Sequence, residues 1–447
     1  MTQSASSGSS SPMPAPGRVS RRRFLASAAV AMAAPYVVPA SVLGADGRKP
    51  PSERIGIGSI GVGGRGTDHL NGMLSRGETQ VLAVCDPQQP KREGAKKRAE
   101  DRYADDLAKG TYKGCLATSD FREVLALPGV DAVFIASPEN WHALNASMAA
   151  AAGKDIYCEK ALSLTVAEGR GLVDAIRRYG RVLQVGTQQR SSRNFRFACE
   201  LARNGYVGKV HTVEVGVPGG QALPNAPAKP VPPGLDYEMW LGPAPYTPYN
   251  DLKCSFNWYF IYDYCIGWIQ SWGVHHVDTA MWGAPGLAAS TLEVEGTAVF
   301  PTTGLANTSL TWRVKARTPD GLTLSFSDNG HHPQGCRFIG DKGWVLVNRG
   351  GIWAEPASVL KAAIRPDEEH LYESHDHHGN FLECLRTRRD PAAPVEAGHA
   401  ATTMTIVCDI ATRVGRKVRW DWKTERFVGD DAANRYLSRS MRNPWHM

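Results

Sequence analysis

The sequence of 447 residues lacks several features that would place it in common classes of protein. Its nine cysteines are widely spaced and include no C-x-x-C pair, which argues against a disulfide framework and against a zinc ribbon. No H-E-x-x-H or facial-triad spacing occurs, so we predict no metal site. The positive residues behind the net charge of +7 form no basic stripe with interleaved aromatics, so we expect no nucleic-acid partner.

Long apolar runs are also missing outside the N-terminus. There, a leader rich in Ser, Pro and Gly precedes Arg21, Arg22 and a Phe-Leu pair, and an Ala/Val-rich stretch broken by Pro35 and Pro39 follows. Residues 1–45 resemble a twin-arginine export signal, although a disordered basic tail with a short hydrophobic patch is the alternative. We therefore expect a periplasmic protein, exported folded by the twin-arginine translocation machinery, with the leader either cleaved or kept as an N-terminal anchor.

After the leader, short apolar segments of strand type alternate with longer segments of helix type. The strand-like segments are 54–60, 79–85, 131–136, 155–158 and 182–185, and the helix-like segments are 65–75, 87–104, 120–127, 141–152 and 166–179. Regular alternation of this kind predicts an α/β domain with a doubly wound parallel sheet.

The pattern changes after residue 209. A proline-dense passage, 218–248, is expected to form no regular structure and to wrap the surface or cover a site. Alternating runs without intervening helices then follow at 291–300, 307–318, 321–327 and 344–347. They predict a second, antiparallel sheet, followed by helices at 374–387 and 399–415.

The most specific local pattern is a glycine-rich loop after the first predicted strand. Gly61, Gly63 and Gly66 form G-x-G-x-x-G, whose glycines make a tight turn, admit a pyrophosphate and allow close helix–strand packing. Asp86 follows Gly66 by 20 residues, at the position where an acid binds the ribose of NAD and repels the 2′-phosphate of NADP. We predict bound NAD rather than NADP, with Val62 and Arg65 of the loop also in contact, against the alternative of a turn without ligand.

Polar residues follow three of the predicted strands at the edge where open α/β sheets bind ligands. We predict cofactor contacts from Ser137, Asn140, His142, Glu159, Lys160 and Gln188. A fourth cluster, within 267–278, holds adjacent histidines, His275 and His276, and Asp278 on a short predicted helix. One histidine is expected to face a cleft and the other to pack.

Together, the glycine loop, the segments 137–142 and 153–160 and the W-G-x-H-H-x-D cluster at 272–278 resemble the Gfo/Idh/MocA oxidoreductases. The resemblance implies a Rossmann domain joined to an α+β domain with a large, open, mainly antiparallel sheet that often forms homodimers or homotetramers. It also implies that Lys160 polarises the reacting hydroxyl and that His275 belongs to an Asp-x-x-x-His proton relay, which makes both residues catalytic. We accordingly assign residues 52–186 to NAD binding, 187–430 to substrate binding and oligomerisation, and 431–447 to a tail that packs back on the fold.

Two positions depart from the family pattern. Ala161 replaces the proline of Glu-Lys-Pro, so we expect no unusual peptide geometry there. Ser271 replaces the aspartate four residues before His275, so the relay is incomplete unless Asp278 or another acid substitutes.

We expect an exported oxidoreductase that uses tightly bound NAD at a secondary hydroxyl of a sugar or sugar-like substrate. Outside the inner membrane no pool of free NAD is expected, so a trapped cofactor must return to its starting redox state in each cycle. Sugar-to-sugar oxidoreduction meets this condition, and so does a glycosidase that oxidises a ring carbon transiently, eliminates and re-reduces. A non-catalytic sugar-binding relative is the third alternative.

Overall fold

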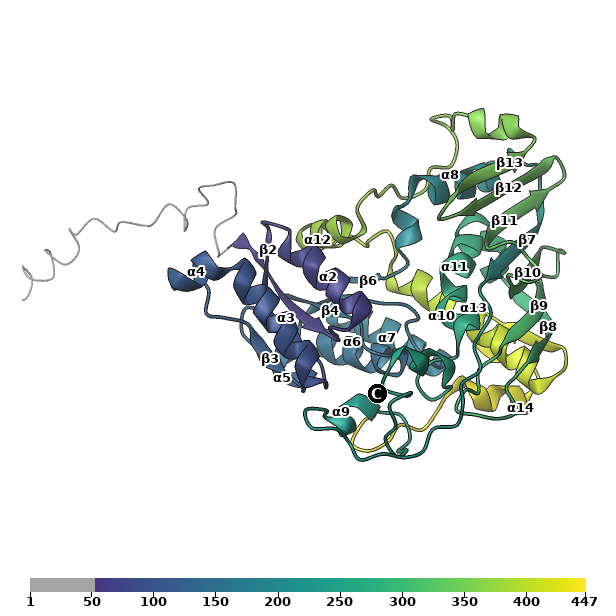
Figure 1. Cartoon of the computed structure of the whole chain (residues 1–447). Coiled ribbons are helices and arrows are strands. Elements are labelled where there is room, and N and C mark those ends of the chain that lie inside the picture. Colours follow the sequence, from purple (N-terminus) through teal and green to yellow (C-terminus); the bar gives the residue numbers. More distant parts are fainter. Residues whose placement is uncertain (1–52) are drawn as a thin grey trace, which may run out of the picture. The chain divides into compact units, whose positions relative to one another are not determined.

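The computed structural model describes residues 53–447 (Figure 1). The predicted twin-arginine signal lies outside the described residues. Within them, no helix combines the length and the hydropathy needed to cross a membrane. All nine cysteines fall in the described part of the chain, and all are free thiols.

The N-terminal sheet confirms the predicted doubly wound parallel arrangement. Within residues 53–447 it has six strands in the order β3-β2-β1-β4-β5-β6, which is the Rossmann order. The strands are β1 (Ile55–Ile60), β2 (Thr79–Cys85), β3 (Leu116–Thr118), β4 (Ala132–Ile135), β5 (Asp155–Cys158) and β6 (Leu183–Val185). The strand β3 was not predicted because it is a short edge strand with two of its three residues only half-buried, whereas the equally short β6 is buried throughout.

Helices cover both faces of this sheet. One face packs against α5 (Phe121–Ala126), α6 (His142–Ala151) and α7 (Val166–Tyr179), and the other against α2 (Gly64–Leu74) and α3 (Gln89–Arg102). The short α4 (Ala104–Ala108) follows α3. A later helix, α12 (His377–Thr387), contributes Phe381 to the same core as α2, so the chain returns to the N-terminal sheet after the second domain (Figure 1).

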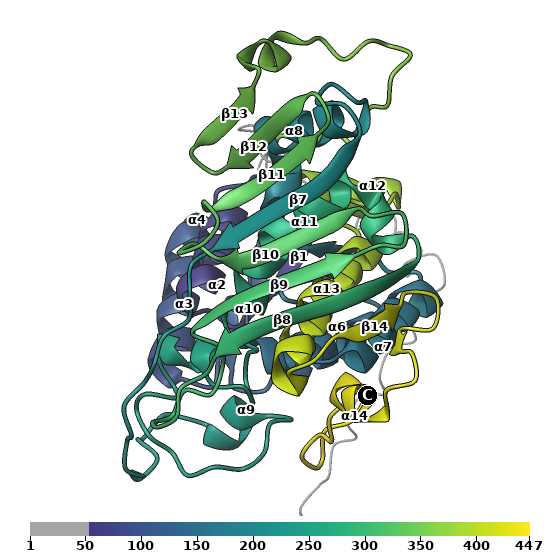
Figure 2. The same ribbon diagram turned by 90° about the vertical axis from the view of Figure 1, so that its right-hand side faces the viewer.

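The C-terminal sheet is open and mainly antiparallel, as predicted. Its nine strands, all in the described part, have the order β13-β12-β11-β7-β10-β9-β8-β14-β15 (Figure 2). They are β7 (Val210–Val217), β8 (Thr291–Val299), β9 (Thr311–Arg317), β10 (Thr323–Asp328), β11 (Gly335–Gly340), β12 (Gly343–Asn348), β13 (Gly351–Glu355), β14 (Val418–Asp421) and β15 (Arg426–Phe427). The chain enters this sheet at β7, which was not predicted and which pairs in parallel with β10.

One face of the C-terminal sheet is packed and the other is polar. Residues alternate along β9, with Trp312, Val314 and Ala316 buried and the intervening side chains exposed. The helices α8 (Arg193–Arg203), α11 (Gly273–Gly283) and α13 (Val395–Val414) lie behind the buried face (Figure 2). The sheet therefore gives α11, which carries His275, a rigid support.

Two further segments, the proline-dense passage with the elements that follow it and the C-terminal tail, pack beside the N-terminal domain. The proline-dense passage is mostly irregular, as predicted, but contains the short helix α9 (Tyr237–Leu241), and η6 (Phe256–Phe260) and α10 (Trp268–Ser271) follow it. Near the C-terminus, after α14 (Asp431–Asn434), Trp445 packs edge-on against Trp141 and near Phe121 of the N-terminal domain. These contacts fix the wall of the cavity described next.

Candidate active site

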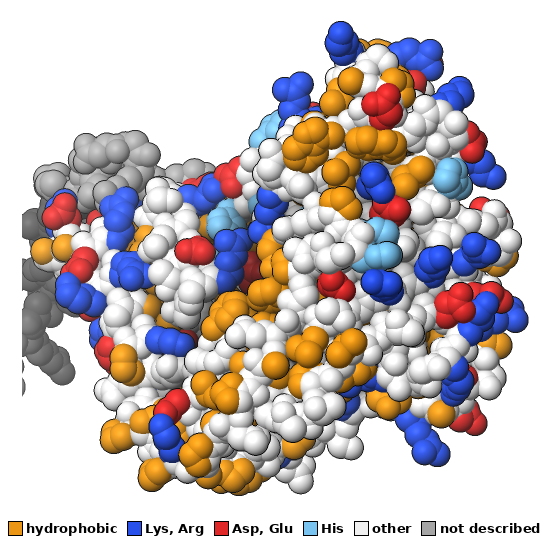
Figure 3. Space-filling view, turned by 45° about the vertical axis from the view of Figure 1, so that its right-hand side comes forward, with side chains coloured by type: hydrophobic (Ala, Val, Ile, Leu, Met, Phe, Trp, Pro, Cys, Tyr) orange, Lys and Arg blue, Asp and Glu red, His pale blue; other side chains and the backbone are white. Residues whose placement is uncertain are grey.

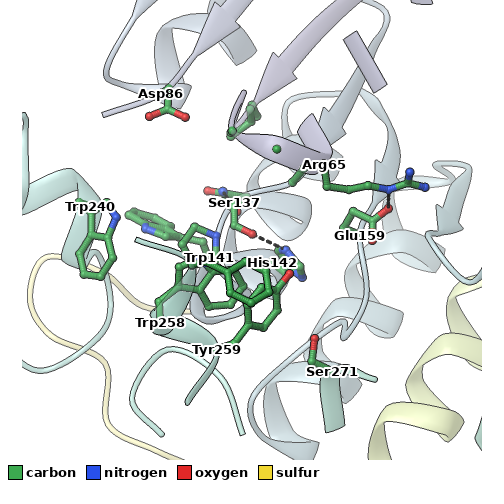
Figure 4. A pocket seen from close by; sticks show the side chains of 18 of the residues that line it. Arg65, Asp86, Ser137, Trp141, His142, Glu159, Trp240, Trp258, Tyr259 and Ser271 are labelled. Atoms are coloured by element: carbon green, nitrogen blue, oxygen red, sulfur yellow. Dashed lines mark hydrogen bonds and ion pairs between the residues drawn. The ribbon is translucent and has the colours of Figure 1, made fainter. Parts of the chain in front are cut away.

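A cavity of about 540 Å³ lies at the carboxyl ends of the parallel strands, and residues of both sheets' domains line it. In Figure 3 hydrophobic side chains gather beside a hollow in the molecular surface. Figure 4 shows Asp86 on one side of the cavity, Glu159 on another, and a group of aromatic side chains from Trp240, Trp258 and Tyr259 along its wall. The structure thus brings the glycine loop, the strand-end residues and the second-domain cluster to one site.

The glycine loop has the backbone geometry that a dinucleotide requires. Gly61 adopts a φ of 79°, and a Cβ there would lie 2.6 Å from the backbone nitrogen of Ser137. A Cβ on Gly66 would lie 1.9 Å from the carbonyl oxygen of Gly61, so only glycine fits at either position. At Gly63 a Cβ would meet only the ammonium of Lys91, 3.7 Å away, which leaves space for a phosphate group at the start of α2. The loop therefore fits the pyrophosphate of NAD.

Asp86 follows β2 and lines the same cavity. Its carboxylate accepts hydrogen bonds from the backbone N–H groups of Val62, at 3.1 Å, and Gln88, at 2.9 Å. Burial raises the pKa of Asp86, while Lys91 and these two N–H groups oppose the rise. Asp86 thus orders the glycine loop and presents an acid at the expected ribose position; Val62 itself packs in the core with its N–H already occupied.

Glu159 has two partners from α2. Its carboxylate accepts from Arg65, at 3.1 Å, and from Nε2 of His69, at 2.9 Å, while Nδ1 of His69 lies 2.8 Å from Nε2 of His378. Burial alone would raise the pKa of Glu159, but the hydrogen bond from His69 and the charges of Arg65 and Lys160 hold it well below its ordinary value. Glu159 is therefore an ionised group that anchors the Lys160 segment to α2.

Lys160 follows β5, and its ammonium reaches across to the second domain. It donates to Oγ of Ser271 at 2.8 Å, lies 3.8 Å from Oε1 of Glu139, and sits 5.6 Å from the ring centre of Tyr259. Burial would lower the pKa of Lys160, but Tyr259, Glu139 and Glu159 raise it, so the group remains an ammonium. The expectation of ordinary peptide geometry is wrong, because the Lys160–Ala161 bond is cis although no proline is present.

His275 lies on α11 with its ring against the cavity. The residue is 5% exposed, and neither ring nitrogen hydrogen-bonds to another residue of the described chain. Burial, followed by the charges of Lys160 and Arg349, lowers the pKa of His275 well below its ordinary value, so the imidazole is neutral. A neutral imidazole with a free lone pair can accept a proton.

The neighbouring His276 packs instead of facing the cavity, as the helical spacing predicted. Its ring is roughly parallel to those of Phe195 and Trp272, with centroid distances of 6.1 and 6.2 Å, and burial lowers its pKa to about 3. Asp278, considered as a substitute for the missing relay aspartate, is bound to Arg190 through two hydrogen bonds of 2.7 and 2.8 Å. It does not line the cavity, so it completes no relay with His275.

The remaining predicted residues divide between the cavity and its supports. Ser137, His142 and Gln188 line the cavity, whereas the amide of Asn140 donates to the carbonyl oxygen of Leu241 behind the wall. The ring nitrogens of His142 lie 2.8 and 2.7 Å from the carbonyl oxygens of Ser137 and Ala161, so this side chain holds two strand-end segments together.

Several lining residues were not predicted. Lys91 and Arg349 contribute cations, and Met239 and Trp240 of α9 contribute apolar wall. For Met239 and Trp240, the one sequence signal was the proline-dense passage, which was expected to cover a site. No motif in the neighbouring sequence indicated that Lys91 or Arg349 would line the cavity. Trp258 and Tyr259 also line the cavity, whereas Tyr264 is buried against Trp240 and does not.

A metal centre is not part of this arrangement. No group of three or more His, Cys, Asp or Glu side chains between residues 53 and 447 is placed to hold a metal ion.

Two family models match the chain. Residues 55–187 match the NAD-binding Rossmann fold of an oxidoreductase family, and residues 219–447, more than half of the chain, match its C-terminal α/β domain.

Individual curated relatives match only part of the chain, at about 30% identity. The chain is 30% identical to a myo-inositol 2-dehydrogenase of Thermotoga maritima over 182 residues, 40% of this chain and 47% of that protein. It is 32% identical to a glycosyl hydrolase family 109 protein of Shewanella sp. ANA-3 over 133 residues, 29% of this chain and 27% of the relative. The chain thus spans less than half the length of either curated relative.

Among solved structures, the fold is similar to that of the WlbA dehydrogenase of Bordetella pertussis, crystallised with NADH and UDP-GlcNAcA. The TM-score is 0.56 at 19% identity, over 81% of this chain and 98% of the other. The two domain matches, the Rossmann strand order and the glycine loop agree: this chain belongs to the Gfo/Idh/MocA oxidoreductase family and carries its NAD-binding Rossmann domain.

Proposed function

We propose that the protein oxidises or reduces a secondary hydroxyl of a sugar or sugar-like substrate with tightly bound NAD. The observation that carries this proposal is that the ammonium of Lys160 and the neutral imidazole of His275 line one cavity with the glycine loop. When bound, NAD supplies the hydride acceptor and donor; the protein supplies the proton chemistry and the shape of the site.

The two side chains divide the proton chemistry. An ammonium has three N–H donors, and Lys160 uses one on Ser271, so others remain to hydrogen-bond a substrate oxygen and to stabilise negative charge on it. His275 accepts the proton released from the hydroxyl and returns it in the reverse direction. The aromatic wall formed by Trp258 and Tyr259 suits the apolar face of a sugar ring and excludes water.

The absent relay aspartate favours a second candidate. His275 has no carboxylate to orient it, because Ser271 occupies the relay position and Asp278 is bound to Arg190. A base of this kind can remove an acidified C–H after transient oxidation of a ring carbon, which leads to elimination of a glycoside with no net redox change. The similarity to a family 109 glycosyl hydrolase over 133 residues supports this alternative.

The location of the protein remains a proposal that rests on the N-terminal sequence. The paired residues Arg21 and Arg22 favour export of the folded holoenzyme to the periplasm. Assembly as a homodimer or homotetramer through the C-terminal sheet is likewise proposed from the family resemblance.

The test uses the purified full-length holoenzyme. After denaturation, we expect about one NAD per chain in the supernatant. A sugar panel should change the absorbance of the bound nicotinamide without free NADH, whereas release of aglycone from nitrophenyl glycosides without net NADH would favour the second candidate. Neither effect, despite bound NAD, would leave a non-catalytic sugar-binding protein.

Variants assign the roles. Lys160→Ala and His275→Ala should each lower turnover by about 10²- to 10⁴-fold and leave the NAD content unchanged, because neither residue touches the phosphate loop. Lys97→Ala on α3 and His211→Ala on β7 change exposed side chains outside the cavity; they are matched controls that should behave as wild type. Loss of NAD from the His275 variant would contradict the assignment.

A further inference from the structure

Arg349 contributes an unassigned cation to the cavity from the C-terminal sheet. It lies in the turn between β12 and β13, where the side chain of Asn348 accepts the backbone N–H of Gly350 at 2.7 Å. Its guanidinium carbon sits 4.7 Å from the ring centre of Trp272. Trp272 is the N-cap residue of α11, so the guanidinium is held beside the helix that carries His275.

This guanidinium has no anionic partner within the described chain. No carboxylate of residues 53–447 lies within ion-pair distance of Arg349, whereas Arg65, which also lines the cavity, is bound to Glu159 at 3.1 Å. Packing on Trp272 uses one face of the planar group and leaves the N–H donors at its edge available. Arg349 is therefore stacked in place with its hydrogen-bonding capacity unused.

The surrounding charges leave this part of the cavity positive. Burial is the main cause of the lowered pKa of His275, and the charges of Lys160 and Arg349 lower it further, so both cations lie near the imidazole. Two carboxylates lie near this part of the cavity: Glu159 is bound by Arg65 and His69, and Glu139 lies 3.8 Å from Nζ of Lys160. Neither carboxylate is within ion-pair distance of Arg349. Burial and the charge of Arg65 lower the pKa of Arg349, and the charge of Glu159 offsets this only in part.

We infer that Arg349 binds a carboxylate of the substrate, so that the protein acts on acidic sugars, such as uronic acids, in preference to neutral ones. The inference rests on the proposed function, because it takes the occupant of this cavity to be a sugar. A guanidinium presents paired N–H groups that match the two oxygens of a carboxylate, and such charge-assisted bonds are strong in a desolvated site. The same contact would place the sugar ring between Trp272 and the catalytic pair Lys160 and His275.

The first test compares two sugars that differ only at C6, D-glucuronate and D-glucose, with D-galacturonate and D-galactose as a second pair. With the full-length holoenzyme, binding is read from the rise in melting temperature at equal ionic strength, and turnover from the absorbance of the bound nicotinamide. We expect the uronates to raise the melting temperature and the neutral sugars to leave it nearly unchanged.

Variants then assign the effect to this side chain. Arg349→Ala should remove the uronate-dependent shift and raise the KM for a reactive uronate about 10- to 100-fold, with kcat little changed. Arg349→Lys should retain part of the affinity. Arg313→Ala, an exposed cation on the outer face of β9, is the matched control and should change neither quantity.

The outcomes separate this inference from the proposed function. Neutral sugars that turn over as well as uronates, or an Arg349→Ala variant that binds uronates normally, would overturn the inference and leave the oxidoreductase intact. Uronates that bind through Arg349 but cause no change in the nicotinamide would instead contradict the proposed function. Loss of NAD from Arg349→Ala would show that the residue holds the cofactor's phosphates, and would also overturn the inference.

Discussion

Replacing Glu139 with Gln removes the carboxylate that supports the charge of Lys160 and keeps the shape of the side chain. Glu139 is 1% exposed, and its Oε1 lies 3.8 Å from Nζ of Lys160 and 3.3 Å from the backbone nitrogen of Ala161. It is the one carboxylate of residues 53–447 within 4.0 Å of that ammonium. A glutamine can still accept from Ala161, so the change acts mainly on charge.

The expected shift follows from the distance. Two unit charges 3.8 Å apart interact by about 4 kcal/mol at an effective dielectric constant of about 20, and by about 1 kcal/mol in bulk water. At about 1.4 kcal/mol for each unit, the variant should lower the pKa of Lys160 by about 1 to 3 units. The sign is fixed, because Glu139 favours the protonated form and so raises this pKa in the native protein.

The assay is the pH dependence of single-turnover reduction of the bound nicotinamide. Because the ammonium of Lys160 is the active form, activity should be lost on the alkaline side, and Glu139→Gln should move this limb to lower pH by at least about 1 unit. Near neutral pH the rate should change little. Glu139→Asp keeps the negative charge, so its alkaline limb should lie close to that of the native protein.

Two results would refute the reasoning. An alkaline limb that does not move in Glu139→Gln would show that another group sets the charge of Lys160. Activity that rises through the alkaline range, along a limb that Glu139→Gln moves to lower pH, would show that the active form is the neutral amine. Because the NAD content is read on the same samples, a folding defect is distinguishable from either result.

Three further predictions address the relay, the fold and the cofactor. Ser271→Asp places a carboxylate four residues before His275 and should raise the pKa of that imidazole. Dehydrogenase turnover should then increase about tenfold, with Ser271→Asn as the uncharged control. Unchanged turnover in both variants would exclude a relay. Arg190→Ala leaves the carboxylate of Asp278 without its partner, and Asp278 is 1% exposed. In denaturant titrations the free energy of unfolding should fall by about 3–5 kcal/mol, and the double variant Arg190→Ala/Asp278→Ala should recover part of this loss. Asp86→Asn should raise the ratio of NADP to NAD affinity about tenfold in reconstitution titrations, because the charge that repels the 2′-phosphate is gone. The amide oxygen can still accept the hydrogen bond from the backbone N–H of Val62. An unchanged ratio would show that Asp86 does not face the 2′ position of the ribose.

The sequence by itself determined the features that depend on neighbours in the chain. Alternating apolar segments specified five of the parallel strands, because side-chain periodicity is a local property of strand and helix. The glycine loop could be assigned to a dinucleotide for a similar reason, since the roles of Gly61 and Gly66 depend on the backbone of one turn. Lys160 and His275 were identified by their motifs, and both line the cavity.

Only the tertiary structure decided which distant groups meet these residues. The carboxylate beside Lys160 is Glu139, from the segment after β4, while Asp278, the nearest acid in sequence to His275, is bound to Arg190. Arg349 enters the cavity from a turn of the other sheet, and nothing in its neighbouring residues marks it. Contacts of this kind join separate elements of the chain, such as Arg190 and Asp278, which are 88 positions apart. They therefore depend on how the sheets and their covering helices pack, which no local pattern in the chain records.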